Sequence, residues 1–123
     1  MRKIKSRPPH FNPVDYIFFL RRHVIMGRSK YEIDDIKEEI NVPPLFDLLK
    51  KLKDDFNYSF ISFQDEFIHQ NGISSLIDVL RICQNRQSLP ENQSRPQHLK
   101  KFLNEEYICL LTLKAASVHK VCN

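Results

Sequence analysis

Residues 72–83 read Gly-Ile-Ser-Ser-Leu-Ile-Asp-Val-Leu-Arg-Ile-Cys, and this stretch carries the clearest periodicity in the chain. Its apolar residues recur at the i, i+3, i+4, i+7 spacing that places side chains on one face of an α-helix. The inward residues predicted from this spacing are Ile73, Leu76, Ile77, Leu80 and Cys83. Gln70-Asn71-Gly72 ends the segment before it.

Upstream, two further amphipathic segments flank a turn predicted at 57–62. The later one begins at Ser62, which forms a start resembling a capping box with Asp65 and Glu66, and its apolar face is predicted to be Phe63, Phe67 and Ile68. The earlier segment is a helix that is predicted to begin directly after the helix-breaking Val42-Pro43-Pro44. Its buried side is predicted to be Leu45, Leu48, Leu49, Leu52 and Phe56.

The first helix is predicted to begin at Asn12-Pro13, with an N-cap and a proline at the first helical position, and to end at Gly27. Its predicted inward residues are Val14, Ile17, Phe18 and Ile25. Ser29 can cap a second, acidic helix, whose shared apolar face is Ile33, Ile36 and Ile40.

Downstream of the opening stretch, residues 84–97 are polar, contain two prolines and have no period, so they are predicted to form a surface loop. A last helix is predicted from about His98 to His119, with a break near Asn104. Its predicted inward residues are Leu99, Phe102, Leu103, Tyr107, Leu110, Leu111 and Leu113.

Composition supports an all-α fold. The chain has 123 residues and only two glycines, too few for the repeated tight turns of a β-sandwich or barrel. Its 41% hydrophobic and 28% charged residues are typical of a folded soluble domain. No apolar run approaches the length of a membrane span, and no secretory signal is recognisable, so an intracellular, cytoplasmic protein is expected.

Charge is distributed unevenly along the chain. Residues 1–30 hold eight Lys/Arg and one Asp, whereas residues 31–66 hold ten Asp/Glu and four Lys. The basic start could contact an anionic membrane or form a solvated tail; both interpretations stay open. Nucleic-acid binding is not expected, because the later basic residues are mixed with acids and lack interleaved aromatics.

Catalytic and metal chemistry is not predicted. The chain lacks phosphate-binding loops and nucleophile motifs, and its three cysteines and five histidines have no metal-ligand spacing. Adjacent acids such as Glu105-Glu106 are interpreted as solvated helix faces. We therefore expect no enzyme activity, no cofactor and no metal.

Taken in order, these segments resemble the GTPase-binding and diaphanous-inhibitory region of formins, the third formin homology region. Pro8-Pro9-His10 followed by Tyr16-Ile17 is similar to the start of that region, and Leu48–Leu52 to its Leu-x-x-Leu helix. Residues 63–80 resemble its first armadillo unit, with Phe63 where the family has Trp. Residues 107–115, Tyr-Ile-Cys-Leu-Leu-Thr-Leu-Lys-Ala, resemble the opening of the next unit.

The resemblance implies a basic tail at 1–11, a small GTPase-binding helical subdomain at 12–57, and a truncated armadillo-repeat α-solenoid at 58–123. Structural core residues are Phe63, Phe67, Leu76 and Leu80. A family loop that contacts the Rho switch regions falls on Asn57, Tyr58 and Ser59, and Asp54 belongs to the residues before it. A plain interhelical turn is an equally weighted interpretation of that loop.

The function implied is that of a regulatory module. A GTP-loaded Rho-family GTPase would bind it and displace the formin's C-terminal autoregulatory segment, which needs further repeats, so that actin is affected indirectly at the cytoskeleton. The alternative is a helical scaffold or membrane-surface adaptor that uses basic residues such as Arg21, Arg22 and Arg28.

Overall fold

The computed structural model describes residues 12–28 and 42–118. Within these ranges the chain forms helices and no strand, which confirms the all-α class. The helices are α1 (Pro13–Arg28), α3 (Leu45–Tyr58), α4 (Ile61–His69), α5 (Gly72–Ser88), α6 (Pro90–Gln93) and α7 (Pro96–Ser117). The basic tail at 1–11, Pro8-Pro9-His10 and the acidic helix expected at 29–40 lie outside the described residues.

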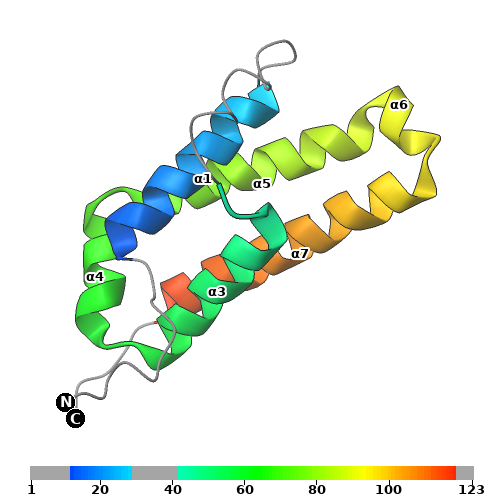
Figure 1. The fold of residues 1–123 in the computed structure, drawn as a ribbon. Coiled ribbons are helices and arrows are strands. Elements are labelled where there is room, and N and C mark those ends of the chain that lie inside the picture. Colours follow the sequence, from blue (N-terminus) through cyan, green and yellow to red (C-terminus); the bar gives the residue numbers. More distant parts are fainter. Residues whose placement is uncertain (1–11, 29–41, 119–123) are drawn as a thin grey trace.

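Helices α5 and α7 form an antiparallel hairpin joined by the short α6, and the other helices pack on this hairpin (Figure 1). Helix α1 lies along α5, whereas α3 lies along α7. Helix α4 connects α3 to α5 and also contacts α1. The chain therefore pairs its first helices with its last ones.

Helix α3 agrees with the sequence prediction on its buried face. All five predicted apolar residues are buried, namely Leu45, Leu48, Leu49, Leu52 and Phe56. The helix runs on to Tyr58, however, because the amide of Ser59 still donates to the carbonyl of Asp55 at 2.8 Å. The turn predicted at 57–62 is thus confined to Ser59 and the extended Phe60.

The inward face predicted for α1 is wrong. The buried residues are Tyr16, Leu20 and Val24, whereas Val14, Phe18 and Ile25 are exposed; of the predicted set, only Ile17 is partly buried against the core. Because α1 is apolar on two opposite faces, periodicity alone does not decide which of them meets α5 and α3.

Gly27 is helical and does not cap α1. A Cβ there would lie 2.5 Å from Cγ2 of Ile82, so the glycine permits the close approach of α1 to α5.

The connection between α4 and α5 is made by Asn71, whose φ of 66° is left-handed. Gly72 then begins α5, and a Cβ on it would lie within 2.5 Å of the ring of Phe67. The cap predicted at Ser62 is wrong, since α4 begins at Ile61 after an extended Phe60. Ile68, predicted to face inward, is exposed.

Gln64 takes the inward position on α4 instead. It is buried, and its side-chain amide donates to the backbone carbonyls of Ala116 at 2.5 Å and Val118 at 2.8 Å. The end of α7 is therefore held by a polar side chain from α4.

The surface loop predicted at 84–97 is mostly helical. Helix α5 continues to Ser88, and α6 and α7 begin at Pro90 and Pro96. Both prolines occupy first helical positions, where the missing N–H costs no hydrogen bond, so they start helices and do not interrupt them. No break occurs at Asn104, because α7 is continuous.

Helix α7 buries a partly polar face. Its buried residues are Glu105, Ile108, Cys109, Thr112 and Ala116. Of the predicted inward residues, Leu103, Tyr107 and Leu110 are exposed, whereas Leu99, Phe102, Leu111 and Leu113 are partly buried. The polar groups find partners there: the Thr112 hydroxyl lies 2.7 Å from the carbonyl of Ile108 and 3.1 Å from that of Leu49.

One buried cluster unites the helices. It contains Tyr16, Leu20, Phe56, Phe67, Leu76, Val79 and Cys109 among others, with Phe63 and Leu80 partly buried against it. Aromatic rings meet edge to face at its centre, with the Phe56 and Phe67 centroids 5.0 Å apart. The cluster includes residues from both sides of the boundary expected at position 57. None of the described helices is both long and apolar enough to cross a membrane.

Candidate functional site

Two aromatic side chains stand almost fully in solvent where α3 ends and α4 begins. Tyr58 is 87% exposed and Phe60 is 85% exposed, the largest values among the exposed large hydrophobic residues. Tyr58 is the last residue of α3, and Phe60 immediately precedes α4. An exposed pair of this size has no role in the core, so the surface around it is a candidate for binding.

The pair borders a groove of about 530 Å³. Its lining combines the start of α1 with the end of α3 and the first turns of α4: Pro13, Tyr58, Ser59, Phe60, Ser62, Phe63 and Glu66. Phe63 lines the groove and also packs edge to face on Phe56, with centroids 5.6 Å apart. The groove is thus anchored directly to the core.

The structure brings all the predicted contact residues to this end of α3. Asp54 has a half-exposed side chain whose Oδ1 lies 3.4 Å from Nζ of Lys53. Asn57 is exposed, and Ser59 lines the groove. Asn57 and Tyr58 belong to the last turn of α3 and not to a loop.

Phe60 lay outside the predicted set, although its apolar side chain next to a turn was a visible signal. Among the residues that the structure describes, no group of three or more His, Cys, Asp and Glu could hold a metal ion. The groove offers apolar contact with polar edges, which suits recognition of a protein surface.

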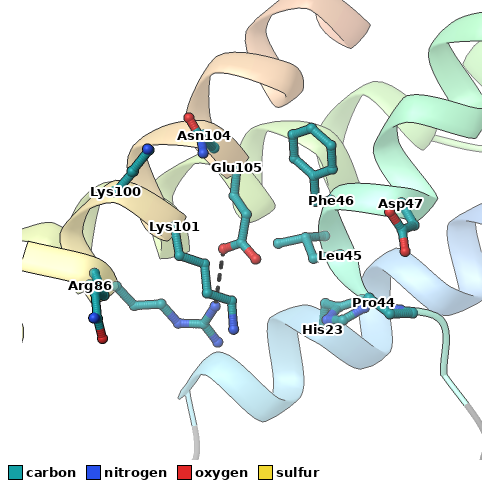
Figure 2. A pocket seen from close by; sticks show the side chains of 11 residues that line it. His23, Pro44, Leu45, Phe46, Asp47, Arg86, Lys100, Lys101, Asn104 and Glu105 are labelled. Carbon is teal, nitrogen blue, oxygen red and sulfur yellow. Dashed lines mark ion pairs between the residues drawn. The ribbon is translucent and has the colours of Figure 1, made fainter.

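A second groove, of about 660 Å³, lies at the opposite end of α3. Figure 2 shows its lining drawn from four helices: His23 of α1, Leu45 and Phe46 of α3, Arg86 of α5, and Lys100, Lys101 and Glu105 of α7. Burial lowers the pKa of His23, whose Nε2 lies 2.7 Å from the carbonyl oxygen of Pro43. We name this site the Glu105 groove.

Glu105 was interpreted from sequence as part of a solvated acidic face, and that interpretation is wrong. The residue is only 4% exposed. Its Oε1 has no hydrogen-bond partner among the described residues and lies 3.9 Å from Nη1 of Arg86. Desolvation raises the pKa of Glu105, while Lys101 and Arg86 oppose that change. Sequence offered no signal, because the apolar residues around it favoured another face of α7.

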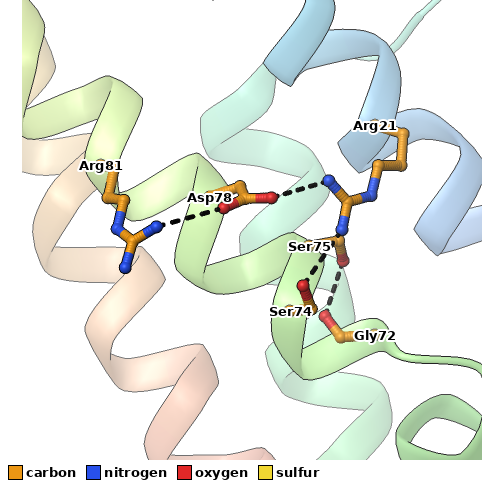
Figure 3. A network of polar contacts seen from close by, with 6 residues as sticks. All are labelled: Arg21, Gly72, Ser74, Ser75, Asp78 and Arg81. Atoms are coloured by element: carbon orange, nitrogen blue, oxygen red, sulfur yellow. Dashed lines mark hydrogen bonds and ion pairs between the residues drawn. The ribbon is translucent and has the colours of Figure 1, made fainter.

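Arg21, a basic residue of the membrane-adaptor hypothesis, is engaged within the fold. Its guanidinium lies 2.8 Å from the Asp78 carboxylate and 3.3 Å from the Ser74 hydroxyl, joining α1 to α5 (Figure 3). Arg81 approaches the other Asp78 oxygen at 3.7 Å. Arg21 therefore contributes to helix packing, and its charge is partly neutralised for any surface partner.

No protein-family model, curated protein or solved structure matches this chain.

Proposed function

We propose that the chain is the regulatory module of a formin and that it binds a GTP-loaded Rho-family GTPase through the surface around Tyr58 and Phe60. The single observation that carries the proposal is the exposure of these two aromatic residues. They lie at the segment where the formin resemblance expects the GTPase contact.

The chemistry of this surface supports protein recognition. Aromatic side chains supply large contact areas at low entropic cost, and they are frequent among the residues that dominate binding energy. Glu66 lines the groove and Asp54 lies one helical turn before Tyr58 on α3, so both provide carboxylates near this surface for basic or hydrogen-bond-donating groups of a partner. A central apolar pair with a polar edge is the usual arrangement in a specific interface.

An armadillo-type arrangement is part of the same proposal. Leu103, Tyr107 and Leu110 form an exposed apolar stripe on α7, opposite its buried face. In an α-solenoid, each helical unit buries such a stripe by stacking on the next unit. The α5–α7 hairpin, with this stripe on its outer side, has the features expected of a unit in a stack.

In this proposal the GTPase favours the state in which the autoregulatory segment is released. Binding has that effect only if the GTP-loaded protein has different affinities for the released and autoinhibited states. The effect on actin assembly is therefore indirect, through the rest of a formin at the cytoskeleton.

The test is surface plasmon resonance with the immobilised chain and Rho-family GTPases loaded with a GTP analogue or with GDP. We expect binding only to the GTP form, with Tyr58→Ala and Phe60→Ala each weakening it about tenfold. Tyr107→Ala is the matched control, since Tyr107 is also an exposed tyrosine but lies outside the groove. Nucleotide-independent binding, or no binding by any family member, would refute the proposal.

A further inference from the structure

The Glu105 groove has the size of a small-molecule site. Its volume of about 660 Å³ falls within the usual range for ligand pockets. Leu45 and Phe46 provide an apolar wall, and charged groups face it from α5 and α7 (Figure 2). The groove is distinct from the surface at Tyr58 and Phe60, because the two share no lining residue.

Cations dominate the α5 and α7 side of the groove. Arg86, Lys100 and Lys101 line it, against the carboxylates of Asp47 and Glu105. With His23 neutral at pH 7, the charged lining residues sum to one positive charge. An anion is therefore the ligand that this wall favours, and several cations together suit a phosphate.

Two of the basic side chains lie over the same aromatic ring. The guanidinium of Arg86 lies 5.5 Å from the centroid of the Phe102 ring, and the Nζ of Lys101 lies 5.9 Å from it. Beside Arg86, the Gln87 side-chain amide donates to the carboxylate of Glu106 at 2.6 Å, fastening α5 to α7. A preorganised cationic wall binds an anion with less loss of side-chain entropy.

Glu105 adds an independent observation that points to a ligand. Its carboxylate is almost completely buried, and its Oε1 has no hydrogen-bond partner in the described structure. A buried acceptor without a partner destabilises the fold, so such groups are expected to have a role. The distance of 3.9 Å to Arg86 exceeds that of a hydrogen bond, but one oxygen about 2.8 Å from both groups could bridge them.

We propose that the Glu105 groove binds a small organic phosphate that carries hydroxyl groups. The phosphate contacts Arg86 and Lys101, and a ligand hydroxyl donates a hydrogen bond to Oε1 of Glu105. Both requirements must be met at once: an anion without hydroxyl groups leaves Oε1 of Glu105 without a hydrogen-bond donor, and a neutral sugar leaves the cations unused. The same chemistry occurs in soluble sugar phosphates and in phosphoinositide headgroups.

Isothermal titration calorimetry on the full chain tests this proposal with glucose 6-phosphate, inorganic phosphate and glucose. We expect glucose 6-phosphate to bind at least about tenfold more tightly than inorganic phosphate, and glucose not to bind. Glu105→Gln should weaken glucose 6-phosphate about tenfold and leave inorganic phosphate unweakened. Arg86→Gln should weaken both. Lys114→Gln, an exposed charge change on α7 outside the groove, should alter neither.

A parallel measurement uses vesicles that contain phosphatidylinositol 4-phosphate. Binding to vesicles that depends on Glu105 and Arg86, without binding of glucose 6-phosphate, would support the same chemistry and assign a lipid source. Absence of binding in both measurements would overturn the proposal. Binding that Glu105→Gln and Arg86→Gln leave unchanged would also overturn it, provided that circular dichroism shows both variants to be folded. Neither result depends on GTPase binding.

Discussion

The hydroxyl of Tyr16 in α1 lies 2.5 Å from Oδ2 of Asp55 in α3. This contact joins the two helices through residues that are 39 positions apart in the sequence. The ring of Tyr16 is fully buried and meets Phe63 edge to face. Burial, followed by the hydrogen bond and charge of Asp55, raises the pKa of Tyr16. The hydroxyl therefore stays protonated at neutral pH and keeps donating its hydrogen bond to Asp55.

Tyr16→Phe should destabilise the fold by about 1 to 2 kcal/mol, because it removes a hydrogen bond to a charged acceptor without opening a large cavity. Urea unfolding followed by circular dichroism measures this change. Tyr58→Phe is the control: its hydroxyl is on an almost fully exposed side chain, so its free energy of unfolding should change by less than about 0.5 kcal/mol. Equal effects of the two substitutions would contradict this role for Tyr16.

Gln64→Ala should lower the free energy of unfolding by about 1 to 3 kcal/mol, because the carbonyls of Ala116 and Val118 lose their side-chain donor. Amide hydrogen exchange should also accelerate in the last turn of α7 before it does elsewhere. Gln70→Ala is the control, because it removes the same kind of side chain, whose amide donates a hydrogen bond to Glu66 on the surface. It should leave the free energy of unfolding nearly unchanged. Unchanged exchange in α7 would show that Gln64 does not hold its end.

Gly27→Ala should destabilise the protein by about 1 to 2 kcal/mol, although the same change in an exposed helix interior stabilises by about 1 kcal/mol. The reason is the 2.5 Å approach to Cγ2 of Ile82. Thermal unfolding of the double variant Gly27→Ala/Ile82→Ala, compared with Ile82→Ala alone, provides the check. Relief of the clash should make Gly27→Ala harmless or stabilising in that background.

Stability should fall as pH rises above about 8.5. Burial raises the pKa of the Cys83 and Cys109 thiols to about 12 in the folded state. The unfolded thiols ionise first, so the unfolded state binds fewer protons, and rising pH lowers its free energy relative to that of the folded state. By pH 10 the loss should reach about 1 to 2 kcal/mol per thiol. A Cys83→Ala/Cys109→Ala variant should show a smaller decline in urea unfolding between pH 8 and 10.

Glu105→Gln should stabilise the fold at pH 7. Desolvation raises the pKa of Glu105, so its contribution to stability is fully present below the ordinary glutamate pKa and is lost as pH rises through the raised value. The gain should therefore vanish near pH 4, where the native carboxyl is protonated. Urea unfolding at both pH values measures it, with the exposed Glu91→Gln as control. Destabilisation at pH 7 would mean that the pair with Arg86 outweighs desolvation.

The buried residues of a helix could be predicted from the sequence where the helix has a single apolar face. Helix α3 has one such face, and its five buried residues were all predicted. Helices α1 and α7 are apolar on both sides, as Phe18 opposite Leu20 and Tyr107 opposite Cys109 illustrate. Only the positions of neighbouring helices decide which face is buried, and periodicity does not contain that information.

The residues of the two grooves also differ in whether the sequence predicts them. Tyr58 was predicted from the resemblance to a contact segment, and its side chain is almost fully exposed in the structure. Glu105 could not be predicted, because its burial follows from the packing of α7 on α3 and α5, and its partner Arg86 lies 19 residues away on another helix. Pro90 and Pro96 favour a loop in the sequence, yet each begins a helix, because proline is frequent both in loops and at the first position of a helix.

The pairing of early helices with late ones has a consequence for synthesis on the ribosome. The Thr112 hydroxyl contacts the carbonyl of Leu49, 63 residues earlier, and Arg21 contacts Asp78, 57 residues later. While the chain grows, α1 can contact α3 and α4, but α1 lacks α5 and α3 lacks α7 until those later helices have left the exit tunnel. Their apolar faces are exposed in the nascent chain for that interval, in which chaperones could bind them.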